Sequence, residues 1–335
     1  MASASVPLLL GAAAVAVLHS ILPDHWVPLA VVGRTQRWSL FRVARVSALA
    51  SAGHVVASVV LAGIIAAIGL QFQRQLETQH RDRRRGLHWL LGRGEVPSQP
   101  TISAPPSVGV IMVVAAHPDD IESWCAGTLA RSIDAGATVR LLLVTSGDKG
   151  SDDPRDSAAD VALRREREAM DAGRRLGLAE VAFLRHPDGE VEDTRALRGE
   201  LVAAIRRWRP AALFTHDPAH PYPPYLTHRD HRVVGRAVLD AAYPLARDRL
   251  SFPEHAAEGL APHAVREVWL FSTDRPTAHV DIGAGFDRKI AARLAHVSQT
   301  RDADALRAGW RERAAQIGAE AGLPLAESFA VLHLD

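Results

Sequence analysis

Hydrophobic and polar positions alternate along residues 107–335 in the order typical of repeated strand–helix units. The β-branched run Val108–Val114 predicts a buried parallel strand, and Ile121–Ala135, which stops at Gly136, predicts the helix after it. Further strands are predicted over Val139–Val144, Val181–Leu184 and Ala211–Thr215, and further helices over Ala158–Leu176, Thr194–Trp208 and His228–Ala242. The pattern predicts an α/β fold, a Rossmann-like parallel sheet with helices on both faces.

The first seventy or so residues have a different pattern. Val6–Leu18 and Val56–Leu70 are apolar runs, and the second, extended back through small residues to about Ser47, is long enough to span a bilayer. No Lys or Arg precedes Arg34, so the basic region of a secretory signal peptide is missing. We therefore expect an N-terminal membrane anchor of two apolar helices over 1–72, an Arg-rich and then Pro/Ser-rich linker over 73–106, and a soluble domain over 107–335.

Polar residues within the predicted anchor raise a second interpretation. His19, Asp24 and His25 form an H-x4-D-H pattern, which resembles part of the nickel/cobalt transporter-like membrane proteins, where such a helix belongs to the metal path. The resemblance covers only about Leu8–Leu70, too few helices to enclose a path, so an anchor is favoured over a metal relay. Arginines flank both apolar runs and leave the topology open. We expect membrane association, with the catalytic domain in the cytoplasm.

Polar turns follow the predicted strands of the soluble domain. The first, His117-Pro118-Asp119-Asp120, comes at the carboxyl end of a strand, where open α/β sheets collect their ligands. Two adjacent carboxylates cannot easily point the same way, so one is suited to bind a metal and the other to face a reacting water. Cys125 is the single cysteine, which excludes a disulfide framework and a thiolate metal cage and leaves His and carboxylate ligands.

A second group of candidate ligands opens the last predicted helix. His228 and His231 are three residues apart and share one helical face, and Asp230 is placed to hydrogen-bond a neighbouring imidazole. The chain has 335 residues, 47% of them hydrophobic, enough for a full core, and its net charge of +1 gives no general affinity for polyanions. No nucleic-acid partner is expected.

Together, the H-P-D-D-x-E and H-x-D-H motifs resemble the LmbE-like (PIG-L) family of zinc-dependent N-acetyl-sugar deacetylases. The resemblance covers about Val108–Gln299. Its other parts are Ala126–Ala130, Thr145–Gly150, the helix positions Arg165, Glu168, Ala172, Leu176 and Gly177, the run Asp287–Lys289, and Ala295–Gln299.

The resemblance implies a Zn²⁺ cofactor, a small-molecule N-acetylated sugar conjugate as partner, and a role for each motif residue. His117, Asp120 and His231 would be the zinc ligands, with a fourth position left for water. Asp119 would be the general base, His228 would stabilise the oxyanion or protonate the leaving amine, and Asp230 would orient His228. Arg165 is a candidate for binding a sugar hydroxyl, although a solvated helix charge is an equally good interpretation.

The sequence departs from the family pattern at several positions. Some relatives have a tyrosine where this chain has Leu226, so Tyr222 or Tyr225 would have to substitute for it. Trp124 and Ala126 stand where glycines are common. Two alternatives to a deacetylase stay open: an amidase that cleaves another C–N bond, as in a thiol conjugate, and a non-enzymatic membrane metal-handling protein. The intact Asp119 favours an enzyme, because a metal store needs no base.

Overall fold

The computed structural model describes residues 31–32, 35–46, 48–49, 101–107, 109–219 and 227–334. The chain divides into two units, Met1–Glu95 and Val96–Asp335. In the first, residues 40–46 are helical. Most of the predicted membrane anchor, including the H-x4-D-H pattern, lies outside the described residues, as do Tyr222, Tyr225 and Leu226. No helix in the described ranges combines the length and apolar character needed to cross a membrane.

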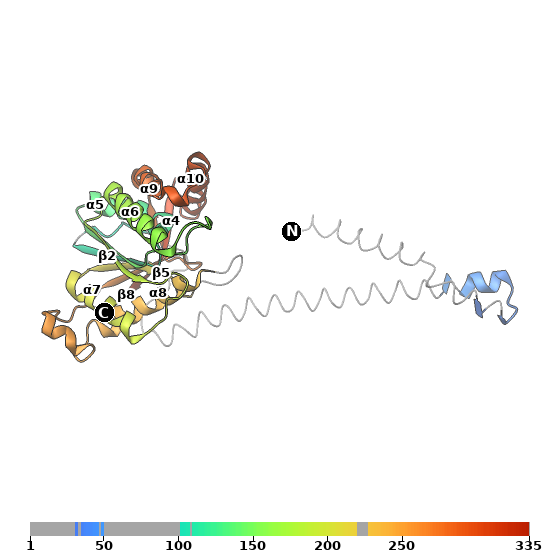
Figure 1. Cartoon of the computed structure of the whole chain (residues 1–335). Coiled ribbons are helices and arrows are strands. Elements are labelled where there is room, and N and C mark those ends of the chain that lie inside the picture. The colour runs from blue at the N-terminus through green and yellow to red at the C-terminus, as the bar shows by residue number, and fades with distance from the viewer. Residues whose placement is uncertain are drawn as a thin grey trace. The chain divides into compact units, whose positions relative to one another are not determined.

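The second unit is built on an eight-stranded sheet with the order β1-β7-β8-β6-β5-β2-β3-β4 (Figure 1). Five neighbouring strands are parallel: β2 (Val110–Ala115), β3 (Thr138–Thr145), β4 (Glu180–His186), β5 (Ala212–His216) and β6 (Glu267–Phe271). The four predicted strands correspond to β2–β5, and each begins and ends within two residues of the observed strand.

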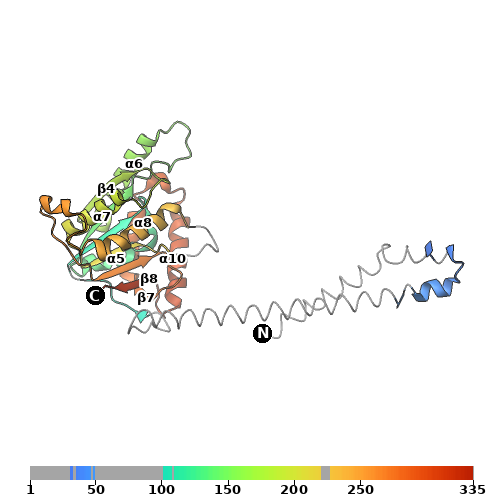
Figure 2. The same ribbon diagram turned by 90° about the horizontal axis from the view of Figure 1, so that it is seen from below.

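The sheet is mixed, which corrects the prediction of a parallel one. β8 (Ala326–His333) runs antiparallel to both β6 and β7 (Ala278–Asp281), and Figure 2 shows β7 and β8 side by side. β6 is the last parallel strand, and its outer N–H and C=O groups are free to pair. β8 runs back along β6 in the opposite direction and forms hydrogen bonds with these groups, which an open parallel sheet permits at its edge. β1 (Thr101–Ile102) pairs with β7, so the end of the predicted linker belongs to the sheet.

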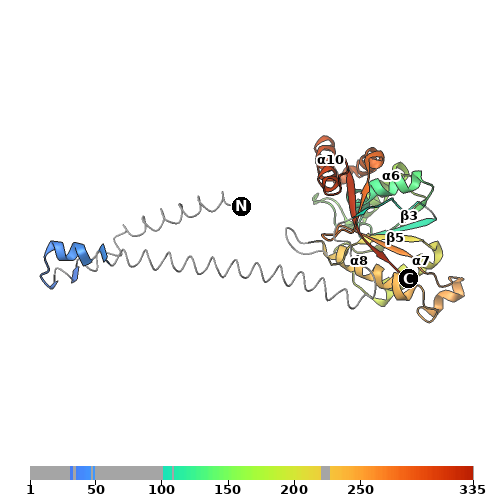
Figure 3. The ribbon, with the colours of Figure 1, turned by 180° about the vertical axis from the view of Figure 1, so that it is seen from behind.

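Helices cover both faces of the sheet, as predicted. One core packs the alternate β2 residues Ile111 and Val113 against α4 (Asp120–Trp124), α5 (Ala126–Asp134), α6 (Ala158–Leu176) and α9 (Phe286–Arg293). The other packs Met112 and Val114 against α7 (Arg195–Trp208) and α8 (Arg229–Asp240). Figures 1 and 3 show the two helix layers on opposite sides of the strands, with α10 (Ala303–Ala319) beside α9.

Local signals explain where most helices begin and end. The Ser157 side chain accepts a hydrogen bond from the Asp160 backbone N–H and caps α6, which stops before Gly177 at a φ of 91°. The single helix predicted over 121–135 is instead two helices, α4 and α5, separated at Cys125, whose φ of −139° is not helical. After α8 the chain also forms a short π-helix at Ala241–Leu245 and short 3₁₀ helices at Pro253–Glu258, Gly283–Gly285 and Val297–Gln299.

Candidate metal centre and active site

The turn from β2 into α4 separates the two adjacent aspartates. Asp119 has a φ of 90°, a left-handed conformation that is uncommon for a residue other than glycine. Asp120 begins α4, and its Oδ2 accepts a hydrogen bond of 2.8 Å from the backbone N–H of His117. The two carboxylates therefore reach different neighbours.

Asp120 meets two histidines at the carboxyl edge of the sheet. Its Oδ1 lies 3.1 Å from His231 Nε2 and its Oδ2 lies 3.5 Å from His117 Nδ1, while the two imidazole nitrogens are 3.2 Å apart. Tetrahedral zinc with bonds of about 2.0–2.1 Å holds its ligand atoms about 3.3 Å apart. The two imidazole nitrogens and the Asp120 carboxylate come from the turn after β2, from α8 and from α4, and their spacing is close to that of ligands around one zinc ion.

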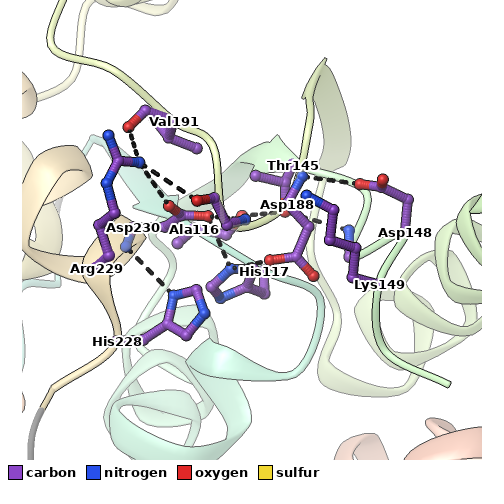
Figure 4. Close-up of polar contacts among 12 residues, drawn as sticks. Ala116, His117, Thr145, Asp148, Lys149, Asp188, Val191, His228, Arg229 and Asp230 are labelled. Atoms are coloured by element: carbon purple, nitrogen blue, oxygen red, sulfur yellow. Dashed lines mark hydrogen bonds and ion pairs between the residues drawn. The ribbon is translucent and has the colours of Figure 1, made fainter. Parts of the chain in front are cut away.

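Two further carboxylates surround the other nitrogen of His117 (Figure 4). His117 Nε2 lies 3.0 Å from Asp188 Oδ1 and 3.4 Å from Asp230 Oδ2. Burial alone lowers the pKa of His117, but hydrogen bonds to Asp120, Asp188 and Asp230 raise it to about 12. A site with this excess of negative charge stabilises a bound cation. Because the carboxylates accept a hydrogen bond from Nε2–H of His117, its Nδ1 remains available as a metal ligand.

His216 is a fourth imidazole in this cluster. It is buried at the end of β5, its Nε2 is 3.3 Å from Asp120 Oδ2, and its ring stacks on His231 with centroids 4.1 Å apart. Burial lowers its pKa to about 4, so the imidazole is neutral. Potential metal-binding groups in the described part of the chain include Asp120, His216 and His231, and also His117, His228 and His231.

Asp119 lies between two arginines. Its Oδ1 is 3.0 Å from Arg165 Nη2, and its Oδ2 is 3.7 Å from Arg293 Nη2. The pKa of Asp119 is raised, chiefly by burial, although the Arg165 charge opposes the shift. A raised pKa makes a carboxylate a better proton acceptor.

Arg165 is buried and contacts the turn that carries Asp119. Only 6% of its side chain is exposed, and its guanidinium also donates to the Pro118 carbonyl at 2.7 Å and to the Gly147 carbonyl at 3.1 Å. A Cβ at Gly147 or Gly150 would collide with this guanidinium, so both glycines make room for it. These contacts hold the turn that carries Asp119, and a contact between Arg165 and a sugar hydroxyl stays a prediction.

The second motif also differs in one contact from what the sequence implied. Asp230 was expected to orient His228, yet its carboxylate faces His117 and accepts a 2.7 Å hydrogen bond from the Gly189 backbone N–H. Its backbone N–H instead donates to His228 Nδ1 at 3.2 Å. The His228 ring stands edge-on to His117, with centroids 4.6 Å apart, and burial lowers its pKa.

The sequence reasoning missed three residues of this site: Asp188, His216 and Arg293. The first two lie in the polar turns His186-Pro-Asp-Gly and Thr215-His-Asp, whose positions after strands were the available signal. Arg293 lies in α9, 174 residues after Asp119, and no local signal pointed to it.

A cluster of His and Asp side chains at the carboxyl edge of an α/β sheet can bind a metal ion that activates a water for hydrolysis, as in metal-dependent hydrolases. Residues 112–242 match the model of the PIG-L family, described as GlcNAc-PI de-N-acetylase. The chain is 32% identical to a diacetylchitobiose deacetylase of Thermococcus kodakarensis, over 56% of this chain and 69% of that protein. It is 28% identical to a probable N-acetyl-alpha-D-glucosaminyl L-malate deacetylase 2 of Bacillus cereus, over 57% of this chain and 83% of the relative.

A solved structure of a deacetylase has the same fold. The N,N'-diacetylchitobiose deacetylase of Pyrococcus horikoshii superposes with a TM-score of 0.63 at 26% identity, over 67% of this chain and 84% of that one. The chain belongs to the PIG-L family. It is an enzyme, an N-deacetylase that acts on a non-peptide C–N bond of an N-acetylglucosamine-type substrate, as the sequence predicted.

Proposed function

We propose that this protein uses zinc, held by His117, Asp120 and His231, to remove the acetyl group from an N-acetylglucosamine unit of a small conjugate. One observation carries the choice of site. His117 Nδ1 and His231 Nε2 lie 3.2 Å apart, and the Asp120 carboxylate approaches both, with Oδ2 3.5 Å from His117 and Oδ1 3.1 Å from His231, close to the ligand spacing around a single tetrahedral ion. When bound, zinc supplies a Lewis acid for the acetamide carbonyl and an acidified water.

The residues of the chain supply proton transfer and orientation. Asp119, held by Arg165 and Arg293, takes the proton of the attacking water. The oxygen of that water bonds to the acetyl carbon, and the C–N bond then breaks to give acetate and a free amine. His228, next to His117, stabilises the oxyanion or donates a proton to the leaving nitrogen. Asp188 and Asp230 fix the orientation of His117.

The test is a substrate panel with the full-length protein. N-acetylglucosamine and N,N'-diacetylchitobiose are incubated with protein that has been stripped by a chelator and then reloaded with Zn²⁺, Mg²⁺ or no metal. We expect acetate and free amine in equal amounts, with activity restored by zinc and not by Mg²⁺, because the nitrogen donors suit zinc better. Release of a longer acyl group in preference to acetate would support the amidase alternative, and activity in the chelated protein would refute the metal site.

We also propose that residues 1–72 anchor the protein to a membrane, with the catalytic unit in the cytoplasm. The support is the sequence alone, the two apolar runs Val6–Leu18 and Val56–Leu70 with arginines beside both. Full-length protein is expected to sediment with membranes, and a chain starting at Val96, which keeps β1, to remain in the supernatant and active. Full-length protein in the soluble fraction without detergent would contradict the anchor.

A further inference from the structure

The two oxygens of the Asp119 carboxylate are held differently. Oδ1 lies 3.0 Å from Arg165 Nη2, which is the distance of a hydrogen bond, whereas Oδ2 lies 3.7 Å from Arg293 Nη2, which is too long for one. Arg293 therefore attracts the carboxylate by its charge and leaves the lone pairs of Oδ2 open to a water. The φ of Asp119, 90°, is a strained conformation that persists only where the surroundings fix it.

Arg293, at the end of α9, is buried and anchored, with only 9% of its side chain exposed. Its Nη1 donates a 2.7 Å hydrogen bond to the Thr300 hydroxyl, and its Nη2 donates a 2.9 Å hydrogen bond to the Gln299 carbonyl. Within the described ranges, the one carboxylate at ion-pair distance from Arg293 is that of Asp119. Burial of a guanidinium is costly, so its placement opposite a single carboxylate of the active site calls for a function.

Gln299 connects the anchored arginine to the turn after β3. Its backbone carbonyl accepts the hydrogen bond from Arg293, and its side-chain Nε2 donates a 2.8 Å hydrogen bond to the Gly150 carbonyl. The Gly150 N–H in turn donates to the Gly147 carbonyl at 3.0 Å. Arg293 is thereby tied, through Gln299, to the turn 147–150.

The same turn also holds the arginine on the other side of Asp119. The Gly147 carbonyl accepts a 3.1 Å hydrogen bond from Arg165 Nη1, while Arg165 Nη2 contacts Asp119. The two arginines therefore belong to one hydrogen-bonded frame, which Gln299 closes. A shift of either arginine would move the other, and with it the Asp119 carboxylate.

A second buried pair lies at the same junction of α4 and α9. His296 Nε2 is 3.5 Å from Glu122 Oε2, and the two side chains are 1% and 2% exposed. Glu122 follows Asp119 by three residues, and His296 follows Arg293 by three residues. The junction cannot open without separating buried polar groups, which is costly, so the distance between Asp119 and Arg293 is fixed by the fold.

We propose that Arg293 and Gln299 are positioning residues for the deacetylation, and that together they orient Oδ2 of Asp119 toward the attacking water. This inference rests on the proposed function. It adds to the active site the segment 293–300, which lies outside the residues 112–242 that match the family model. A misplacement of about 1 Å in a catalytic group can cost about 10²-fold in rate, so loss of the frame should be visible in turnover.

The first experiment compares Arg293→Lys with Arg293→Met in zinc-loaded, full-length protein. Lysine keeps the positive charge but loses the planar fork that reaches Thr300 and Gln299, and methionine loses both. Acetate release from N,N'-diacetylchitobiose gives kcat and KM. We expect kcat to fall about 100-fold in Arg293→Met and less than about 10-fold in Arg293→Lys, with KM unchanged in both. Equal losses of kcat would overturn the proposal, because a purely structural arginine is lost in both variants.

Arg288→Met is the matched control on the same helix. Arg288 pairs with Asp134 of α5 at 2.5 Å, so its loss should leave kcat and KM unchanged. Zinc content and urea unfolding are measured on every preparation. Zinc content should stay at the wild-type level in all of them, and loss of zinc in Arg293→Met would assign this arginine to the metal centre and overturn its assignment to the base.

Gln299→Leu tests the frame without removing a buried charge. The Gln299 side chain is partly exposed, so this variant should fold even if Arg293→Met does not. It removes the hydrogen bond to Gly150 and should lower kcat about 3- to 10-fold at unchanged KM, because both arginines remain but are no longer tied together. An unchanged kcat would overturn the role of Gln299 and of the frame.

A double-mutant cycle tests whether Arg293 acts through Asp119. In Asp119→Asn the base is already lost, so adding Arg293→Met should lower the remaining kcat by less than about 3-fold, since coupled residues are not additive. A full further loss of about 100-fold would show that Arg293 acts independently of the base and would overturn the proposal.

The failure of this inference differs from the failure of the proposed function. If the wild-type protein hydrolyses no member of the substrate panel, the proposed function fails and the positioning role fails with it. If the wild type releases acetate and Arg293→Met turns over at the wild-type rate, the positioning role alone fails and the deacetylase proposal stands.

Discussion

Replacing Asp119 by asparagine tests whether Asp119 and Asp120 have different functions, one as general base and the other as metal ligand. Asparagine has nearly the same volume and still hydrogen-bonds water, but it cannot accept the proton. Loss of a general base typically costs about 10²- to 10⁴-fold in rate, or roughly 3 to 5 kcal/mol of barrier. We expect the loss mainly in kcat, because the proton moves only in the transition state.

The structure adds a second expected effect of Asp119→Asn. The 3.0 Å contact with Arg165 loses its carboxylate charge, although this buried guanidinium keeps its hydrogen bonds to Pro118 and Gly147. A hydrogen bond to a charged group contributes about 1.5–3 kcal/mol, so the free energy of unfolding should fall by up to that amount. Because asparagine still accepts one hydrogen bond from Arg165, the protein should stay folded at 25 °C.

The assays are turnover, zinc content and urea unfolding, measured on the same preparations. Asp120→Ala should lower zinc content, because it removes the oxygens beside His117 and His231, and excess zinc should restore part of the activity. Asp119→Asn should retain zinc, and Asp153→Asn, at an exposed ion pair with Arg155, is the control.

Loss of zinc in Asp119→Asn with retention in Asp120→Ala would reverse the two roles. Near-normal turnover in both variants would place the active site elsewhere. In the wild type, activity requires deprotonated Asp119 and should be lost as pH falls through its pKa, which burial raises, so the loss begins above the usual pH for an aspartate.

Three further predictions concern the metal centre and the core. Asp188→Asn should weaken zinc affinity about 10- to 100-fold in a chelator competition, because Asp188 orients His117; unchanged affinity would contradict that role. Chelation should lower the Tm in a scanning calorimeter, because the clustered carboxylates then lack a stabilising cation, and an unchanged Tm would argue against a resident metal. Lys289→Met should lower the free energy of unfolding by about 3–5 kcal/mol, since it leaves Glu327 charged and buried. Lys149→Met, at an exposed pair, should lower it far less, and equal losses in urea would refute this difference.

The sequence by itself determined much of the first half of the fold. The residue pattern predicted α6 with its observed bounds, Ala158–Leu176. This agreement is possible because the features that end the helix, the Ser157 cap and the left-handed Gly177, act locally. The same local signals could not give β8, whose antiparallel pairing with β6 depends on how the chain returns to the sheet edge. They also could not show that Cys125 interrupts the helix after Asp120.

The sequence also identified His117, Asp120 and His231 as candidate ligands, through motifs at the ends of strands and helices. Only the tertiary structure decided which groups surround them. It placed Asp188 and Asp230 at His117, and it buried Arg165 beneath Asp119. Residue spacing predicts which side chains share a face of one element, whereas contacts between elements depend on the packing of the whole sheet and its helices.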